Sequence, residues 1–226
     1  MRTACLLAVL LAAASIACGQ VPPSTAERGA YRGLFAAAGQ GDAAAIKRLL
    51  AAGENVEARD AYGRTPLHVA AYAQQRDAMR ALAAAGVDPN ALEHDRYDIV
   101  TIAAVADDVP TLETALAIGG RATNITSRYD GTALIAAAHL GHDAVVRTLI
   151  RAGAPLDHVN NLGWTAVIES IVLGDGGRRH VATLRALIDA GANVNLADRA
   201  GATPLALARA RGYADMVAML VEAGGR

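Results

Sequence analysis

The residue types in this chain that most suggest chemistry are gathered in one short stretch, VLGDGGRRH, from Val172 to His180. Three glycines and an aspartate stand directly before two arginines and a histidine. A glycine-rich turn that opens a helix can bind phosphate through its backbone N–H groups. The stretch has neither the GxxxxGK[ST] pattern of a P-loop nor the GxGxxG pattern of a dinucleotide site. Three interpretations of Gly174–His180 stay open: a long turn, a loop that contacts a partner protein, and a ligand-binding or catalytic loop for phosphate or a metal.

Glu169, just before this loop, stands at a helix position that we expect to face the core. In similar segments elsewhere in the chain the corresponding residues are Val69, Ile102, Ala136 and Leu207. A buried carboxylate is costly unless it is hydrogen-bonded or paired. We therefore predict that Glu169 anchors the loop by accepting hydrogen bonds from loop N–H groups, from Arg178 or from His180. The alternative is a local twist that leaves Glu169 in solvent.

His139 and His142, with the adjacent Asp143, are the other residues whose types suggest metal binding. A metal site needs further converging ligands, which the spacing does not supply. No serine–histidine–acid or cysteine–histidine arrangement stands out. We therefore expect structural roles for these histidines, and no enzymatic activity, no cofactor and no metal.

An internal repeat supplies the elements that must position these residues. Each unit has a threonine, a run of small and apolar residues, a polar turn, a second apolar helix and a glycine. This repeated threonine, the threonine thread, occurs as Thr65, Thr132, Thr165 and Thr203, and Asp98 takes its place in the third unit. Along the chain, these five residues follow one another at intervals of 33, 34, 33 and 38 residues. Leu34–Gly53 repeats the pattern less perfectly, which makes six units. The five-residue excess of the fifth unit falls between its two helices, in the VLGDGGRRH stretch.

The motif TPLHVAA, Thr65 to Ala71, together with this period, resembles the ankyrin repeat. The resemblance covers about residues 30–226 and implies an all-α repeat solenoid, in which each of about six units has a β-hairpin finger and two antiparallel helices. One apolar helix stripe cannot bury itself, so neighbouring units must stack. The segment HVNNLGWTAVIESIVLGDGG, which begins at His158, is similar to a subgroup of bacterial ankyrin proteins, many of them exported.

The resemblance implies protein binding through the finger tips and the inner-helix ends, on the concave side of the solenoid. The corresponding residues here are Tyr62, Arg64, Tyr72, His94, Tyr97, Arg128, Tyr129, His139, Asn161, Trp164, Arg199 and Arg211. Tyrosine, tryptophan and arginine dominate interface hot spots. The alternative is that the aromatic side chains pack finger against finger. The third unit departs from the family pattern, because Arg96 replaces the usual finger glycine.

The N-terminus carries an export signal. An apolar run follows Arg2, and we interpret residues 1–17 as a signal peptide, 18–26 as a short tether and 27–226 as the ankyrin repeat domain. Cys18 directly follows a small-residue cleavage site. It is either lipidated, which would attach the protein to a membrane, or inert after a plain signal peptide. Ser24 with Glu27 three residues later predicts a capping box and a helix that begins near Thr25.

The net charge of −1 gives no electrostatic case for binding nucleic acid or an anionic membrane surface. The sequence therefore predicts an exported, monomeric interaction module that binds an envelope or periplasmic protein through its concave surface. Two alternatives stay open. One is a structural envelope lipoprotein without a specific groove ligand, and the other is a ligand-binding or catalytic protein that uses the Gly174–His180 loop.

Overall fold

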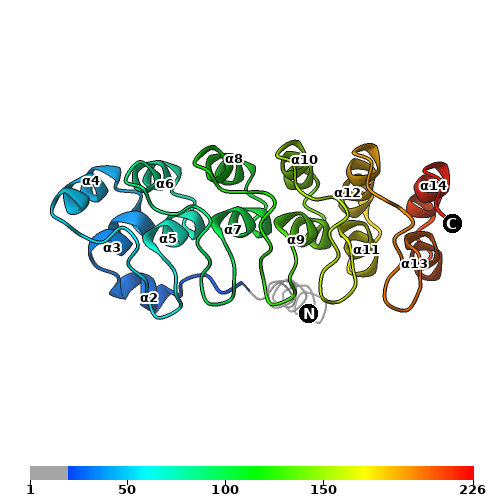
Figure 1. Ribbon diagram of the computed structural model, residues 1–226, viewed down its shortest axis with the longest axis horizontal. Helices are drawn as coiled ribbons and strands as arrows, with labels where there is room; N and C mark the ends of the chain where they lie inside the picture. Colours follow the sequence, from blue (N-terminus) through cyan, green and yellow to red (C-terminus); the bar gives the residue numbers. More distant parts are fainter. Residues whose placement is uncertain (1–19) are drawn as a thin grey trace, which may run out of the picture.

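The computed structural model describes residues 20–226, so the predicted signal segment and Cys18 lie outside the described residues. Two parallel rows of helices run along its length, and finger-like loops project beyond the inner row (Figure 1). The inner row consists of the first helices α3 (Gly33–Gln40), α5 (Pro66–Tyr72), α7 (Ile99–Val105), α9 (Ala133–Leu140), α11 (Ala166–Val172) and α13 (Pro204–Arg211). The outer row consists of the second helices α4 (Ala43–Ala51), α6 (Arg76–Ala83), α8 (Val109–Ala117), α10 (Asp143–Arg151), α12 (Arg178–Asp189) and α14 (Ala214–Glu222). The six helix pairs confirm the predicted all-α solenoid of about six units.

The threonine thread marks the start of the first helices. Thr65, Thr132 and Thr165 each accept a hydrogen bond through the side chain from the backbone N–H three residues later. Asp98 does the same for Thr101, so the residue that breaks the sequence pattern preserves the cap. Aspartate and threonine both cap helix N-termini well, which is why the substitution leaves the unit intact.

The core lies between the two rows, where each unit buries aliphatic side chains against the next. Ile46, Leu82, Leu112, Leu149 and Leu187 on successive second helices are all inaccessible to solvent. Alanines of the first helices, such as Ala70, Ala103 and Ala137, are buried as well. Because each unit buries its apolar stripe only against its neighbours, the stack supplies the stability that a single helix pair lacks.

The fingers are successive turns and contain a single isolated bridge, Thr126 with Gly131, in the part of the chain that the structure describes. Backbone hydrogen bonds join neighbouring fingers. His94 N–H donates to Tyr62 O (3.0 Å), Ser127 N–H to Arg96 O (2.9 Å), and Asn161 N–H to Tyr129 O (2.9 Å). The fingers of units two to five therefore form one connected edge.

Two fingers hold a non-glycine residue in the left-handed region of φ. Arg96 (φ 66°) and Asp130 (φ 50°) occupy the position at which the other fingers have Gly63, Gly163 and Gly201. Left-handed backbone costs a residue with a Cβ about 1 kcal/mol. The two side chains form an ion pair with each other, from Arg96 Nη1 to Asp130 Oδ1, at 2.7 Å. This contact links the third finger to the fourth.

A short helix, α2 (Thr25–Ala30), precedes the first unit, and its Ser24–Glu27 capping box confirms the sequence prediction. The residues that precede α2 contact the repeat domain and do not form a free tether. Arg64 Nη1 donates to Val21 O (3.4 Å), Arg28 donates to Pro23 O, and Pro23 is buried. Residues 20–30 therefore pack on the repeat domain.

Candidate binding site on the finger face

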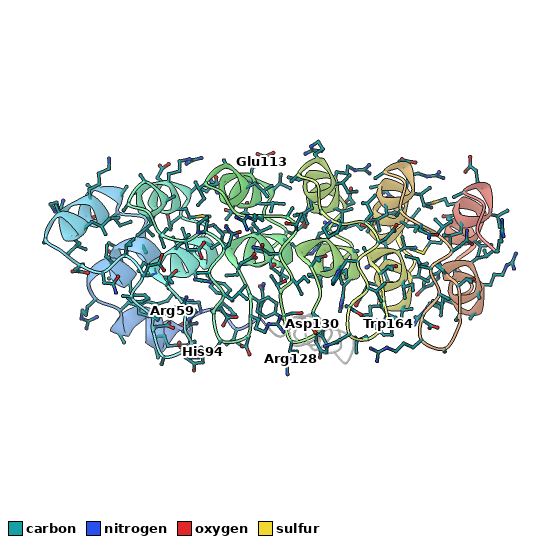
Figure 2. All side chains as sticks on the ribbon, in the orientation of Figure 1. Arg59, His94, Glu113, Arg128, Asp130 and Trp164 are labelled. Carbon is teal, nitrogen blue, oxygen red and sulfur yellow. The ribbon has the colours of Figure 1, made fainter. Side chains whose placement is uncertain are left out.

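The finger face is the surface formed by the finger loops and the first helices α5, α7, α9, α11 and α13. Figure 2 places His94 and Arg128 at the finger tips, and Glu113 on the outer row of helices. Six of the predicted partner-binding residues are exposed: Tyr62, His94, Arg128, Asn161, Arg199 and Arg211. Four are half-buried: Tyr72, Tyr129, His139 and Trp164. The remaining two, Arg64 and Tyr97, are buried.

Arg64 is a structural residue, and its predicted contact with a partner is wrong. It is 1 % exposed. Its Nε donates to Asp60 Oδ2 (2.8 Å), and its Nη2 donates to Glu27 Oε1. Tyr31 completes the group by donating from its hydroxyl to Asp60 Oδ2 (2.7 Å). The helix α2 brings Glu27 onto the second finger, so the guanidinium is enclosed by partners from its own chain.

Tyr97 is also buried, so its predicted exposure at a finger tip is wrong. Its residue exposure is 3 %, and its backbone oxygen accepts a hydrogen bond from His68 Nε2 (3.2 Å). The ring packs inside the stack, as the alternative of finger-against-finger packing required. Apolar ring area is more stable in this interior than at a tip in water.

A pocket opens on the finger face where three fingers meet the helix α9. Its cavity volume is about 50 Å³. Tyr97, Tyr129 and Asn160 contribute from successive fingers, and Ala136 and His139 contribute from α9. The remaining lining residues are Thr101, Thr126, Ser127, Gly131, Thr132 and Ile135. This volume holds a few water-sized groups, and none of the lining residues carries a permanent charge.

Glu169, on α11, is buried beside this pocket, but its partners are not those predicted. It is 4 % exposed. Its Oε1 accepts from Asn160 Nδ2 (3.0 Å), and its Oε2 lies 3.4 Å from His139 Nδ1. The prediction that Glu169 anchors the Gly174–His180 loop is therefore wrong, as is the alternative that it points into solvent. The carboxylate faces the fifth finger and the end of α9.

The Gly174–His180 loop is held by other groups. His180 bridges Asp175 Oδ1 (2.8 Å) and the backbone oxygen of His139 (2.9 Å), and the hydroxyl of Tyr213 donates to Gly174 O (2.9 Å). A Cβ at Gly176, whose φ is 68°, would overlap the Tyr213 ring. The glycines therefore allow close packing against the neighbouring units.

The insertion is divided between the loop and a longer helix. The second helix α12 has 12 residues, compared with 9 in α10. Arg179 donates to Asp107 Oδ2 (2.8 Å), so the loop also reaches the turn of the third unit. These contacts favour the long-turn interpretation over a ligand-binding one.

His68 and His142 have structural roles, because each hydrogen-bonds to a neighbouring unit. His68 is 1 % exposed, with Nδ1 at the Thr65 cap, and burial lowers its pKa to about 4. His142 donates from Nδ1 to Ala104 O (2.9 Å) in the preceding unit, and burial lowers its pKa as well. In its neutral form, the His68 ring joins its unit to the next one, and the His142 ring joins its unit to the previous one.

Within residues 20–226, no three His, Cys, Asp or Glu side chains converge in a way that could hold a metal ion. In the same part of the chain, no helix is both long enough and apolar enough to span a bilayer.

The family model for ankyrin repeats (three copies) matches residues 10–93 and 100–195. The chain belongs to the ankyrin repeat family. Ankyrin repeats are protein–protein interaction modules, and proteins built from them are generally scaffolds without catalytic activity.

Ankyrin proteins of bacteria are among the similar chains. The putative ankyrin repeat protein YahD of Escherichia coli K12 is 34 % identical over 189 residues, which are 83 % of this chain and 94 % of YahD. An ankyrin repeat domain from Acinetobacter baumannii AYE, solved by crystallography, is 42 % identical with a TM-score of 0.79, covering 85 % of this chain and 98 % of that one. The ankyrin domain of Bcl-3 is 26 % identical with a TM-score of 0.76, covering 87 % of each chain.

The ankyrin pattern located most of the surface but not the pocket. Sequence reasoning missed Asn160, Thr101 and Thr126 because their types are common in turns and caps. One signal was present in Asn160. At the same finger position the second and sixth fingers have aspartates, Asp60 and Asp198. Asn160 has an amide there instead of a carboxylate, and this amide can donate a hydrogen bond to the neighbouring Glu169.

Proposed function

We propose that this protein is an exported ankyrin solenoid that binds an envelope or periplasmic protein through its finger face. The observation that supports the proposal is the pocket between three fingers, with exposed tip residues on either side of it. Tyr62, Arg128 and Asn161 stand on separate fingers and are open to solvent. Side chains of these types, spread over a continuous surface, are typical of interface anchors.

The fingers are also held in place before any partner arrives. Besides the backbone hydrogen bonds, His158 Nε2 donates to Asp130 O (2.6 Å) and Asn161 Nδ2 donates to Arg128 O (2.9 Å). A surface that is ordered in advance loses less conformational entropy on binding. This rigidity supports a binding role.

The test replaces exposed tip residues and compares the result with a matched change on the outer row. The triple variant Tyr62→Ala, Arg128→Ala and Asn161→Ala should retain its far-ultraviolet circular dichroism and lose at least about tenfold in affinity for a protein captured from the envelope fraction of the native host. The control variant Arg48→Ala, Glu113→Ala and Val221→Ala changes exposed residues of second helices and should bind as the parent does. Equal capture by both triple variants would contradict the proposal.

Membrane attachment through Cys18 is a separate part of the proposal and rests on the sequence of residues 1–18. If Cys18 is lipidated, the full-length protein should sediment with membranes, and Cys18→Ser should move it to the soluble fraction. If the parent is already soluble, attachment is excluded and the binding proposal is unaffected.

A further inference from the structure

Glu169 is the residue that the fold does not fully explain. Its carboxylate is buried, one oxygen is hydrogen-bonded to Asn160, and the other, Oε2, accepts no hydrogen bond from the part of the chain that the structure describes. Leaving a buried charged acceptor without a partner costs more than a neutral hydrogen bond contributes. Val69, Ile102 and Leu207 at the corresponding positions avoid this cost.

The unpartnered oxygen lies next to the pocket of the finger face. Asn160, which donates to one carboxylate oxygen, and His139, whose Nδ1 is 3.4 Å from the other, both line that pocket. His139 contacts Oε2 without hydrogen-bond geometry, and its side chain is 17 % exposed. His139 therefore both lines the pocket and contacts Oε2, so a turn of this ring is the movement by which a ligand in the pocket would reach the carboxylate.

Within residues 20–226, no lysine or arginine side chain lines the pocket. Arg96 is paired with Asp130 at 2.7 Å, and the Arg128 guanidinium lies 5.8 Å from the centre of the Tyr129 ring. Neither arginine lines the cavity. Tyr97 and Tyr129 provide two aromatic walls, and such rings attract a cation when it is desolvated.

We propose that this pocket binds the lysine or arginine side chain of a protein partner, with Glu169 as the counter-ion and His139 as the movable cover. The proposal rests on the proposed function and names the chemistry of the partner residue. A buried carboxylate with a free oxygen supplies an acceptor, the lining adds no cation, and the cavity has the size of an ammonium with its adjoining methylene groups. A cation that enters replaces the 3.4 Å contact of His139 Nδ1 with a permanently charged partner for Oε2.

The first experiment uses small probes and needs no identified partner. The protein is titrated at constant ionic strength with n-butylammonium chloride, methylguanidinium chloride or neutral n-butanol, and the Asn160 side-chain amide and the His139 ring are followed by NMR. We expect saturable shifts with the two cations and none with butanol. Glu169→Gln should weaken cation binding at least tenfold, and the matched control Glu113→Gln, an exposed outer-row change, should not.

A second variant keeps the test independent of any effect of Glu169 on folding. Ala136→Ile fills the pocket and leaves the carboxylate in place. Its counterparts in the other units are Val69, Ile102 and Leu207, so the position accepts a branched side chain. This variant should also lose cation binding, whereas His139→Ala, which removes the cover, should bind at least as well as the parent. Equal shifts with butanol, or retained cation binding in Glu169→Gln, would overturn the proposal.

The captured partner separates failure of this proposal from failure of the proposed function. If the tip variant loses the partner while Glu169→Gln and Ala136→Ile keep it unchanged, the finger face binds protein but the cation pocket is refuted. If no protein is captured by the parent, the proposed function fails, and the probe titration still decides whether the pocket binds cations.

Discussion

Two buried charged residues, Arg64 near the N-terminal end and Glu169 in the fifth unit, each stand in a polar group, and the two groups differ in how completely the charge is paired. At the N-terminal end Arg64 is enclosed by Glu27 and Asp60, and its donors have partners. In the fifth unit Glu169 accepts a hydrogen bond from Asn160, and among residues 20–226 its other oxygen has only the 3.4 Å contact with His139 Nδ1, which is not a hydrogen bond. The first group is closed, and the second borders a pocket that Asn160 and His139 line.

The directions of the pKa shifts in the closed group agree with its geometry. Burial opposes ionisation of Asp60, but hydrogen bonds from Tyr31 and Arg64 outweigh it and hold the pKa of Asp60 below its ordinary value. Hydrogen bonds from Ser24, together with the Arg64 side chain, lower the pKa of Glu27. A closed group of this kind fastens α2 to the second finger. Burial of charge alone therefore does not mark a site, whereas burial with an unused acceptor does.

The largest expected effect comes from breaking the closed group. Arg64→Ala should lower the free energy of unfolding by about 3–5 kcal/mol, because it leaves Glu27 and Asp60 without their cation. Urea denaturation followed by circular dichroism measures the loss. Exposed Arg76→Ala is the matched control and should change stability by less than about 0.5 kcal/mol. A loss below about 1 kcal/mol for Arg64→Ala would show that the group is not closed in solution.

His68 connects the second unit to the pocket wall through Tyr97 O, and it should be the site of acid sensitivity. Its pKa is lowered to about 4 in the folded protein, from 6.5 in the unfolded chain. The unfolded state therefore binds more protons between these values, and stability falls as the pH drops from 6.5 toward 4, by up to about 3 kcal/mol.

Urea denaturation at several pH values tests this expectation. His68→Gln should flatten the stability profile between pH 6.5 and 4 relative to the parent. Carboxylates titrate in both proteins, so only the difference between the two profiles is attributed to His68. Parallel profiles would mean that the His68 ring is not kept neutral by burial.

Glu169→Gln should have the opposite sign to Arg64→Ala. Removing a buried charge whose second oxygen accepts no hydrogen bond from the described residues should raise the free energy of unfolding by about 1 kcal/mol, while the amide oxygen can still accept from Asn160. The same denaturation assay measures the change. A loss of more than about 1 kcal/mol would place Glu169 with the closed group, as a structural residue paired by His139.

The smallest expected effect concerns the rim of the pocket. Arg96→Gly with Asp130→Gly removes two strained left-handed residues and also removes their exposed ion pair. We expect a net change between zero and about +1 kcal/mol, because relief of backbone strain outweighs a surface ion pair. Comparing the two single variants with the double variant isolates the pair energy. A clear destabilisation by the double variant would show that the pair holds the third and fourth fingers together.

Local patterns in the sequence were sufficient for most of the fold. A cap depends on one side chain and the backbone three residues later, so the threonine thread and the Ser24 capping box could be located without a structure. The period of about 33 residues identified the stacking because each unit needs its neighbours to bury the same stripe. The burial of Glu169 could be inferred in the same way, from its counterparts in other units.

Contacts between parts of the chain that are distant in sequence determine which finger residues are buried, and local sequence patterns could not predict these contacts. Arg64 and Tyr97 occupy finger positions that predict exposure, but α2 covers the first and the stack encloses the second. The repeat, the caps and the position of an unusual carboxylate follow from the amino-acid sequence alone. That this carboxylate meets Asn160 and His139 rather than the Gly174–His180 loop depends on the stacking of the units, because side chains from different units become neighbours only when the units stack.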